Sequence, residues 1–151
     1  MVKNEVRWAF RLSGGQKGDY KVGDWVDKPV RAKIVNVVDN KIVLKFTAKK
    51  IQGVGVGGGK VWTDGLKIIV NREELTYEAK DKIIVDESGD TATLVKAKAV
   101  GVRGIVLVGD RIISGLPIVR LSPQQMEIFK KWGKESNRIW LNGTSGKIFI
   151  T

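Results

Sequence analysis

The first third of the chain alternates apolar with polar residues at a period of two. Residues 6–12 interleave charged and bulky side chains, and a β-branched run, 30–38, precedes a second alternating run, 41–47. Such alternation predicts strands with one buried face. Asp39-Asn40 separates the last two runs, and both residue types accept the backbone angles of tight turns. The pattern therefore predicts a β-sheet that includes a hairpin.

Residues 81–121 follow a different pattern, which predicts a β-α-β unit. The continuous apolar runs 83–85 and 102–108 are typical of strands buried on both faces. Between them, residues 91–100 are rich in good helix formers. Asp90 or Thr91 can cap the start of this helix, and Gly101 is placed to end it.

A second helix is predicted directly after the apolar run 118–121. Ser122-Pro123 followed by Gln125 combines an N-cap serine, a proline at the first helical position and a capping-box glutamine. Gly133 is placed to close the helix. The apolar face of this predicted helix consists of Met126, Phe129 and Trp132.

The remaining residues complete an α+β, mostly β fold. Residues 138–141 and 147–151, joined by Asn142-Gly143, predict a C-terminal hairpin. We expect an N-terminal β barrel or sandwich, either a barrel-sandwich hybrid or SH3-like, over residues 1–70. Residues 71–151 then form a small β-α-β-α layer with the C-terminal hairpin, packed with the first part as one compact unit.

Composition removes most catalytic chemistry. The chain of 151 residues has no cysteine and no histidine, which excludes thiol nucleophiles, zinc-thiolate sites and Ser-His-Asp arrangements. We therefore expect a non-enzymatic protein without a cofactor. No apolar run approaches the roughly 20 residues of a membrane helix, so we expect a cytoplasmic protein with no membrane partner. Abundant Lys, Ile and Val without Cys and His are also compatible with a thermophilic source.

Charge points to a polyanionic partner. The net charge is +11, and residues 1–50 carry twelve basic against five acidic side chains, whereas residues 51–100 are nearly neutral. Basic residues contact phosphates and aromatic faces stack on bases, so a basic β surface with aromatics is typical of RNA-binding modules. The residues expected to bind RNA or DNA are Lys21, Lys28, Arg31, Lys33, Lys41, Lys45, Lys49, Lys50, Tyr20 and Trp25.

Two other interpretations remain open. The chain could be a scaffold that binds protein partners or itself through strand edges. It could also bind a nucleotide or another small molecule through Gly53–Gly59, which is otherwise a structural linker or β-turn. The carboxylates Asp81, Asp86, Glu87 and Asp90 could hold a divalent cation or act only as helix caps.

Several segments resemble known modules. Residues 20–26, with Gly23-Asp24, resemble the KOW type of SH3-like barrel, in which the next hairpin contacts RNA. The same turn before Pro29 is similar to the barrel-sandwich hybrid of biotinyl and lipoyl carriers, although no Met-Lys-Met is present to carry biotin. Residues 20–151 also resemble an uncharacterised bacterial family that joins such a β half to a small α/β half.

Overall fold

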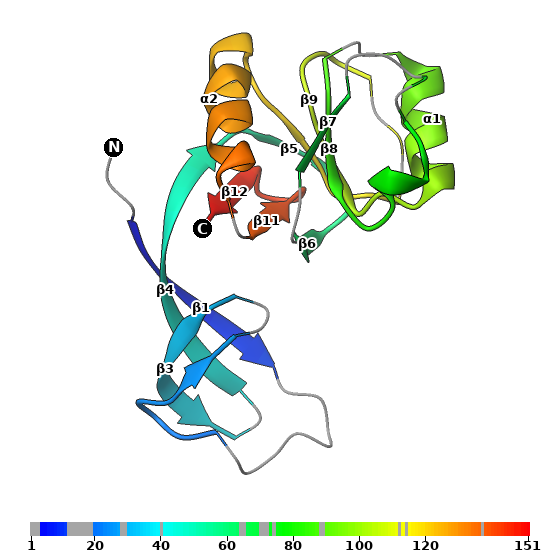
Figure 1. The fold of residues 1–151 in the computed structure, drawn as a ribbon. Coiled ribbons are helices and arrows are strands. Elements are labelled where there is room, and N and C mark those ends of the chain that lie inside the picture. The colour runs from blue at the N-terminus through cyan, green and yellow to red at the C-terminus, as the bar shows by residue number, and fades with distance from the viewer. Residues whose placement is uncertain are drawn as a thin grey trace. The chain divides into compact units, whose positions relative to one another are not determined.

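The computed structural model describes residues 4–11, 20–27, 30–39, 41–63, 66–69, 73, 75–87, 90–111, 113, 115–136 and 138–151. The chain forms two compact units, residues 1–49 with Thr151 and residues 50–150. The structure thus divides the chain between Lys49 and Lys50, whereas the boundary drawn from the sequence follows residue 70. Residues 54–63 form β5 and β6, which are strands of the second unit (Figure 1). The structural boundary therefore comes about 20 residues earlier in the chain than the predicted one.

The first unit contains an antiparallel sheet of four strands. These are β1 (Asn4–Arg11), β2 (Trp25–Val26), β3 (Ala32–Val38) and β4 (Lys41–Gln52), in the order β2-β3-β4-β1. The predicted β3–β4 hairpin is confirmed, and Asp39 in its turn has a φ of 53°. The buried face is formed by alternate residues Ala32, Ile34, Ile42, Leu44, Phe46 and Ala48, with Val30 just before β3.

The second unit is built on a five-stranded sheet in the order β5-β10-β9-β8-β7. Four strands are parallel, namely β7 (Leu66–Ile69), β8 (Ile83–Asp86), β9 (Gly104–Leu107) and β10 (Ile118–Arg120). The antiparallel edge strand is β5 (Val54–Gly57). Helix α1 (Thr91–Val100) connects β8 to β9, so the predicted β-α-β unit is confirmed.

A smaller sheet completes the second unit. Strand β11 (Ile139–Asn142) pairs with both β12 (Lys147–Ile150) and β6 (Lys60–Thr63). The predicted C-terminal hairpin is therefore present as β11 and β12. Strand β12 neighbours β4 in the sheet order, and the last three residues of β4 belong to this unit.

The central strands of the five-stranded sheet, β8, β9 and β10, are buried on both faces. One face packs against α2 (Pro123–Lys134) and the C-terminal hairpin, with Phe129 and Ile139 in that core. The other face packs against α1, with Leu94 and Ala97 in a second core. The two helices consequently lie on opposite sides of the sheet (Figure 1).

Capping residues set the helix ends. The Asp90 side chain accepts a hydrogen bond from the Ala92 amide at 2.9 Å, and Gly101 adopts a left-handed conformation with a φ of 98°. At α2, Ser122 and Gln125 form the predicted capping box. The predicted end at Gly133 is corrected, because α2 continues to Lys134 and Gly133 is buried within its last turn.

The glycine-rich stretch is mostly strand, which corrects the linker or β-turn prediction. Residues 54–57 form β5 and residues 60–63 form β6, so only Gly53, before β5, and Gly58 and Gly59, after it, lie between strands. A Cβ at Gly55 would lie 2.5 Å from the carbonyl oxygen of Thr144, and one at Gly58 would overlap the backbone of Leu116. Glycine is therefore required here because backbone packs directly on backbone.

Strands predominate in this structure, together with two helices among the described residues and a curled half-barrel sheet. The predicted α+β, mostly β class is confirmed. Neither helix has the length and apolar character that crossing a bilayer requires, as far as the described residues extend.

Candidate nucleic-acid interface

One cross-strand row of side chains runs over the exposed face of the first unit's sheet. Trp25 in β2 is the Cα partner of Lys33 in β3, Lys33 is the partner of Lys45 in β4, and Lys45 is the partner of Arg7 in β1. Register partners carry their side chains on the same face, with Cβ atoms about 4.5–5.5 Å apart. We call Trp25, Lys33, Lys45 and Arg7 the basic row.

The alternation along β4 explains why this face is basic. Ile42, Leu44 and Phe46 point into the core, which turns Lys41 and Lys45 to the opposite face. Lys41 is exposed and lies at the hairpin end of the strand. The sequence therefore places one apolar face and one cationic face on the same short sheet.

Trp25 supplies the aromatic end of the basic row. Its side chain is 56% exposed, and the guanidinium carbon of Arg31 lies 5.1 Å from the ring centroid. Arg31 is in turn held by Asp27 through an ion pair of 2.6 Å. The ring is thus oriented by a cation–π contact and still offers surface to a ligand.

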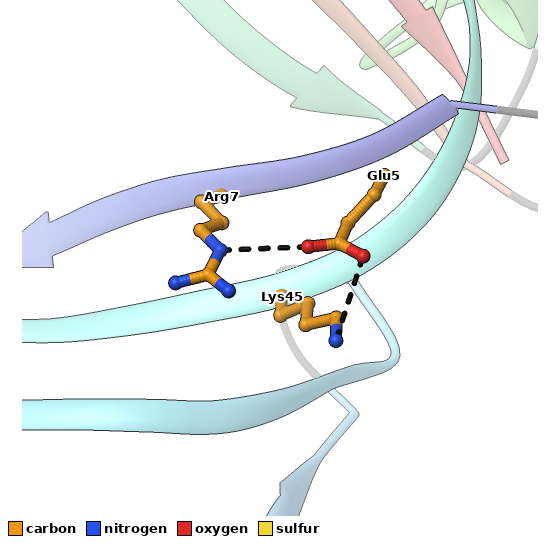
Figure 2. Close-up of polar contacts among 3 residues, drawn as sticks. All are labelled: Glu5, Arg7 and Lys45. Carbon is orange, nitrogen blue, oxygen red and sulfur yellow. Dashed lines mark hydrogen bonds and ion pairs between the residues drawn. The ribbon is translucent and has the colours of Figure 1, made fainter.

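Glu5 places a carboxylate on this face. Its Oε1 lies 3.4 Å from Nε of Arg7, and its Oε2 lies 3.5 Å from Nζ of Lys45 (Figure 2). All three side chains are well exposed, so solvent screens these ion pairs. Glu5 consequently reduces the positive potential of the row without removing it.

The other aromatics of the first unit have different positions. Phe46 is buried, and Trp8 is the register partner of buried Leu44, which places Trp8 on the core face. Tyr20 is half-buried, next to exposed Lys21 in the segment before β2. Within the described part of this unit, Trp25 is the aromatic residue that is largely exposed.

Lys49 and Lys50, at the end of the predicted set, do not lie on one surface. Lys49 shares the β4 face of Lys45 and is half-buried, whereas Lys50 lies on the opposite face and belongs to the second unit. Lys28 lies outside the described residues. The structure thus brings Lys33, Lys45 and Trp25 together, with Lys41 on the same face and Arg31 beside Trp25.

The predicted set does not contain Arg7 or Glu5, which the structure adds to this face. Both occupy odd-numbered positions of an alternating strand, and their exposed side chains share one side of β1. Alternation in residues 4–11 is the signal that could have identified them.

The carboxylates considered from the sequence are dispersed. Asp81 precedes β8, whereas Asp86 and Glu87 are at its other end. Glu87 pairs with Lys130 at 3.0 Å, and Asp90 caps α1. Over the residues the structure describes, no three acidic side chains gather in a way that could hold a metal ion.

Comparisons with known proteins add no relative: no family model, no curated protein and no solved structure matches the chain.

Proposed function

We propose that the first unit binds single-stranded nucleic acid, in particular RNA, through the basic row. The observation that carries this proposal is the register that aligns Trp25 with Lys33, Lys45 and Arg7 across four strands. Three interstrand spacings of about 4.8 Å make the row about 14 Å long. A ligand lying across the strands would meet all four side chains.

The two kinds of side chain have complementary roles. Lys33, Lys45 and Arg7 would neutralise phosphates and release counterions, while Trp25 would stack on an unpaired base. Stacking needs an exposed base face, which a single strand offers and a continuous duplex does not. The proposal therefore includes a preference for single strands over duplexes.

A fluorescence-anisotropy titration with a labelled, mixed-sequence single-stranded RNA tests this function. Three phosphate contacts on a single strand predict a slope of about −2 for log K against log salt, or a roughly 20-fold loss of affinity between about 50 and about 200 mM salt. A duplex DNA of equal length is the comparison ligand. Absence of RNA binding at about 50 mM salt would overturn the proposal and direct attention to protein partners and self-association.

Matched charge variants locate the surface. Lys33→Gln with Lys45→Gln should bring the slope to about −0.7, since one of three contacts remains. Lys131→Gln with Lys134→Gln removes the same charge from exposed positions of α2 in the second unit and should leave the slope unchanged. Equal effects of the two double variants would show that net charge, and not the basic row, drives binding.

Trp25→Ala tests the aromatic part separately. Loss of one stacked base should weaken RNA binding by about 1–3 kcal/mol with little change in the salt slope, because no charge is removed. An unchanged affinity would contradict stacking on Trp25.

A further inference from the structure

The second unit contains a basic pocket that is distinct from the basic row. Its volume is about 310 Å³, and it is lined by Trp62, Thr63, Lys80, Asp81, Lys82, Arg103 and Arg138. Lys80–Lys82 lead into β8 and Arg103 leads into β9, so these residues lie at the amino ends of two parallel strands. Trp62 and Thr63 end β6, and Arg138 directly precedes β11.

Backbone hydrogen bonds fix the walls of the basic pocket. The Asp81 amide donates to the Gly101 carbonyl at 2.9 Å, and the Arg103 amide donates to the Lys82 carbonyl at 2.9 Å. On the other side, Thr63 and Trp62 are register partners of Ile139 and Trp140 in the β6–β11 pair. Asp81, Lys82 and Arg103 are therefore mounted on hydrogen-bonded backbone, and Arg138 directly precedes a paired strand.

The charge of this pocket favours an anion. Four lining residues, Lys80, Lys82, Arg103 and Arg138, are cationic, and Asp81 is acidic. Asp81 lies 3.4 Å from Nε of Arg103, but both side chains are more than half exposed, so this pair offsets little of the excess. Two arginines can present forked donors to a phosphate, which is the geometry that guanidinium groups bind best.

An adjacent hollow carries an aromatic ring. Its volume is about 600 Å³, and it shares Lys80, Asp81 and Lys82 with the basic pocket while adding Tyr77 and Glu78. Tyr77 is 78% exposed, and Nζ of Lys80 lies 5.6 Å from its ring centroid. A large aromatic side chain exposed beside a cationic pocket can contact a planar group attached to a bound anion.

We propose that these two hollows together bind a small phosphate monoester with a planar ring, a nucleotide in chemical class. The phosphate occupies the basic pocket against Arg103, Arg138 and Lys82, and the ring lies against Tyr77. Lys80 stands between the two hollows and contacts both parts of the ligand. This site shares no residue with the basic row and does not depend on RNA binding.

Protein NMR with AMP as the probe tests the site. Backbone amide signals of residues 80–82 and 101–103 and the indole signal of Trp62 should shift on titration to about 10 mM, ten times the Kd of a weak millimolar site. The amide of Tyr77 should shift with AMP but not with inorganic phosphate. Adenosine, which lacks the phosphate, should leave all these signals in place.

Variants that remove charge at different places distinguish AMP binding at this site from nonspecific attraction to the positive charge of the protein. Arg103→Gln and Lys82→Gln should each weaken AMP binding at least tenfold, while Lys131→Gln with Lys134→Gln should not change it. The amide spectrum of each variant shows whether the fold is retained, and two variants at different strands keep the test valid if one of them unfolds.

Three results would overturn the proposal. The first is an absence of AMP-dependent shifts at these residues. The second is an AMP affinity that is insensitive to both Arg103→Gln and Lys82→Gln in folded protein. The third is equal affinity for AMP and inorganic phosphate with no shift at Tyr77, which would reject the ring contact.

Discussion

Lys33 and Lys45 are Cα partners across the β3–β4 pair, and their side chains share the exposed face of the sheet. Like charges directly opposite each other destabilise a sheet. A surface that only solubilised the protein could spread these charges, whereas a phosphate-binding surface gains from concentrating them. Under the proposed function, binding and stability therefore oppose each other at this pair.

Lys33→Thr should raise the free energy of unfolding by about 0.5 kcal/mol and weaken RNA binding, because it removes one member of the like-charge pair. Urea denaturation measures the first effect and anisotropy the second. In about 1 M salt the stability gain should shrink to the part due to strand propensity, because screening suppresses the repulsion. A loss of stability at low salt would contradict the repulsion between Lys33 and Lys45.

Glu5→Gln should increase affinity for single-stranded RNA. The Glu5 carboxylate lies within ion-pair distance of both Arg7 and Lys45, so its removal releases two cations for phosphate contacts. We expect a roughly two- to fivefold gain at about 50 mM salt, declining as salt increases. Asp27→Asn removes the same charge beside Arg31 outside the basic row and should have a smaller effect. Weaker RNA binding by Glu5→Gln would show that Glu5 orients the two cations productively.

Gly58→Ala and Gly59→Ala form a matched pair. Both glycines have positive φ, 88° and 82°, but a Cβ at Gly58 would overlap the backbone of Leu116, whereas nothing lies within 4 Å of a Cβ at Gly59. Gly59→Ala should cost about 1 kcal/mol through the left-handed conformation alone. Gly58→Ala should cost at least about 3 kcal/mol more or prevent folding, and thermal and urea denaturation compare them. Similar costs would contradict the close approach of Gly58 to the backbone of residues 116–117.

Lys130 connects α2 to the end of β8. Its ammonium group lies 2.9 Å from Glu127 and 3.0 Å from Glu87, and these hydrogen bonds raise the pKa of Lys130 above its ordinary value. Because the pKa of Lys130 is raised in the folded state, its ion pairs contribute fully to the free energy of unfolding below the unfolded-state pKa of about 10.4. That contribution is lost as pH rises through the folded-state pKa.

Lys130→Gln should therefore lower the free energy of unfolding by about 1 kcal/mol at about pH 8, and the difference from the parent protein should vanish at high alkaline pH. Urea denaturation at both pH values measures this. Lys131→Gln is the control, because Lys131 is an exposed neighbour on the same helix. A difference that stays constant into strongly alkaline solution would reject the contribution of the charged pairs.

The elements predicted best from the sequence are those specified by neighbouring residues. Ser122, Pro123 and Gln125 determine the start of α2 through contacts within one turn, and Asp90 and Gly101 determine both ends of α1 in the same way. The sequence places the end of α2 one residue early, because Gly133, though suited to a helix end, is buried within the last turn.

Features that depend on distant partners could not be predicted in this way. Gly55 is required because of Thr144, and Gly58 because of Leu116, which are far away in sequence. The basic row depends on strand register, and a bulge between Ile34 and Asn36 shifts the β3–β4 pairing partway along. Charge counts identify the basic segment. Only the pairing of β3 with β4 shows that Lys33 lies opposite Lys45, whereas Lys50 lies on the other face of β4.

The pairing of β6 with β11 constrains the order of events during synthesis. Residues 60–63 find their sheet partner only after residues 139–142 have been translated, and β5 similarly waits for β10. The strand pairs of the first unit are complete within residues 4–48, so that sheet can assemble while most of the second unit is still unmade. A nascent chain whose first sheet has assembled in that interval carries β5 and β6 without their strand partners, and the ribosome is the first polyanion which that cationic sheet meets.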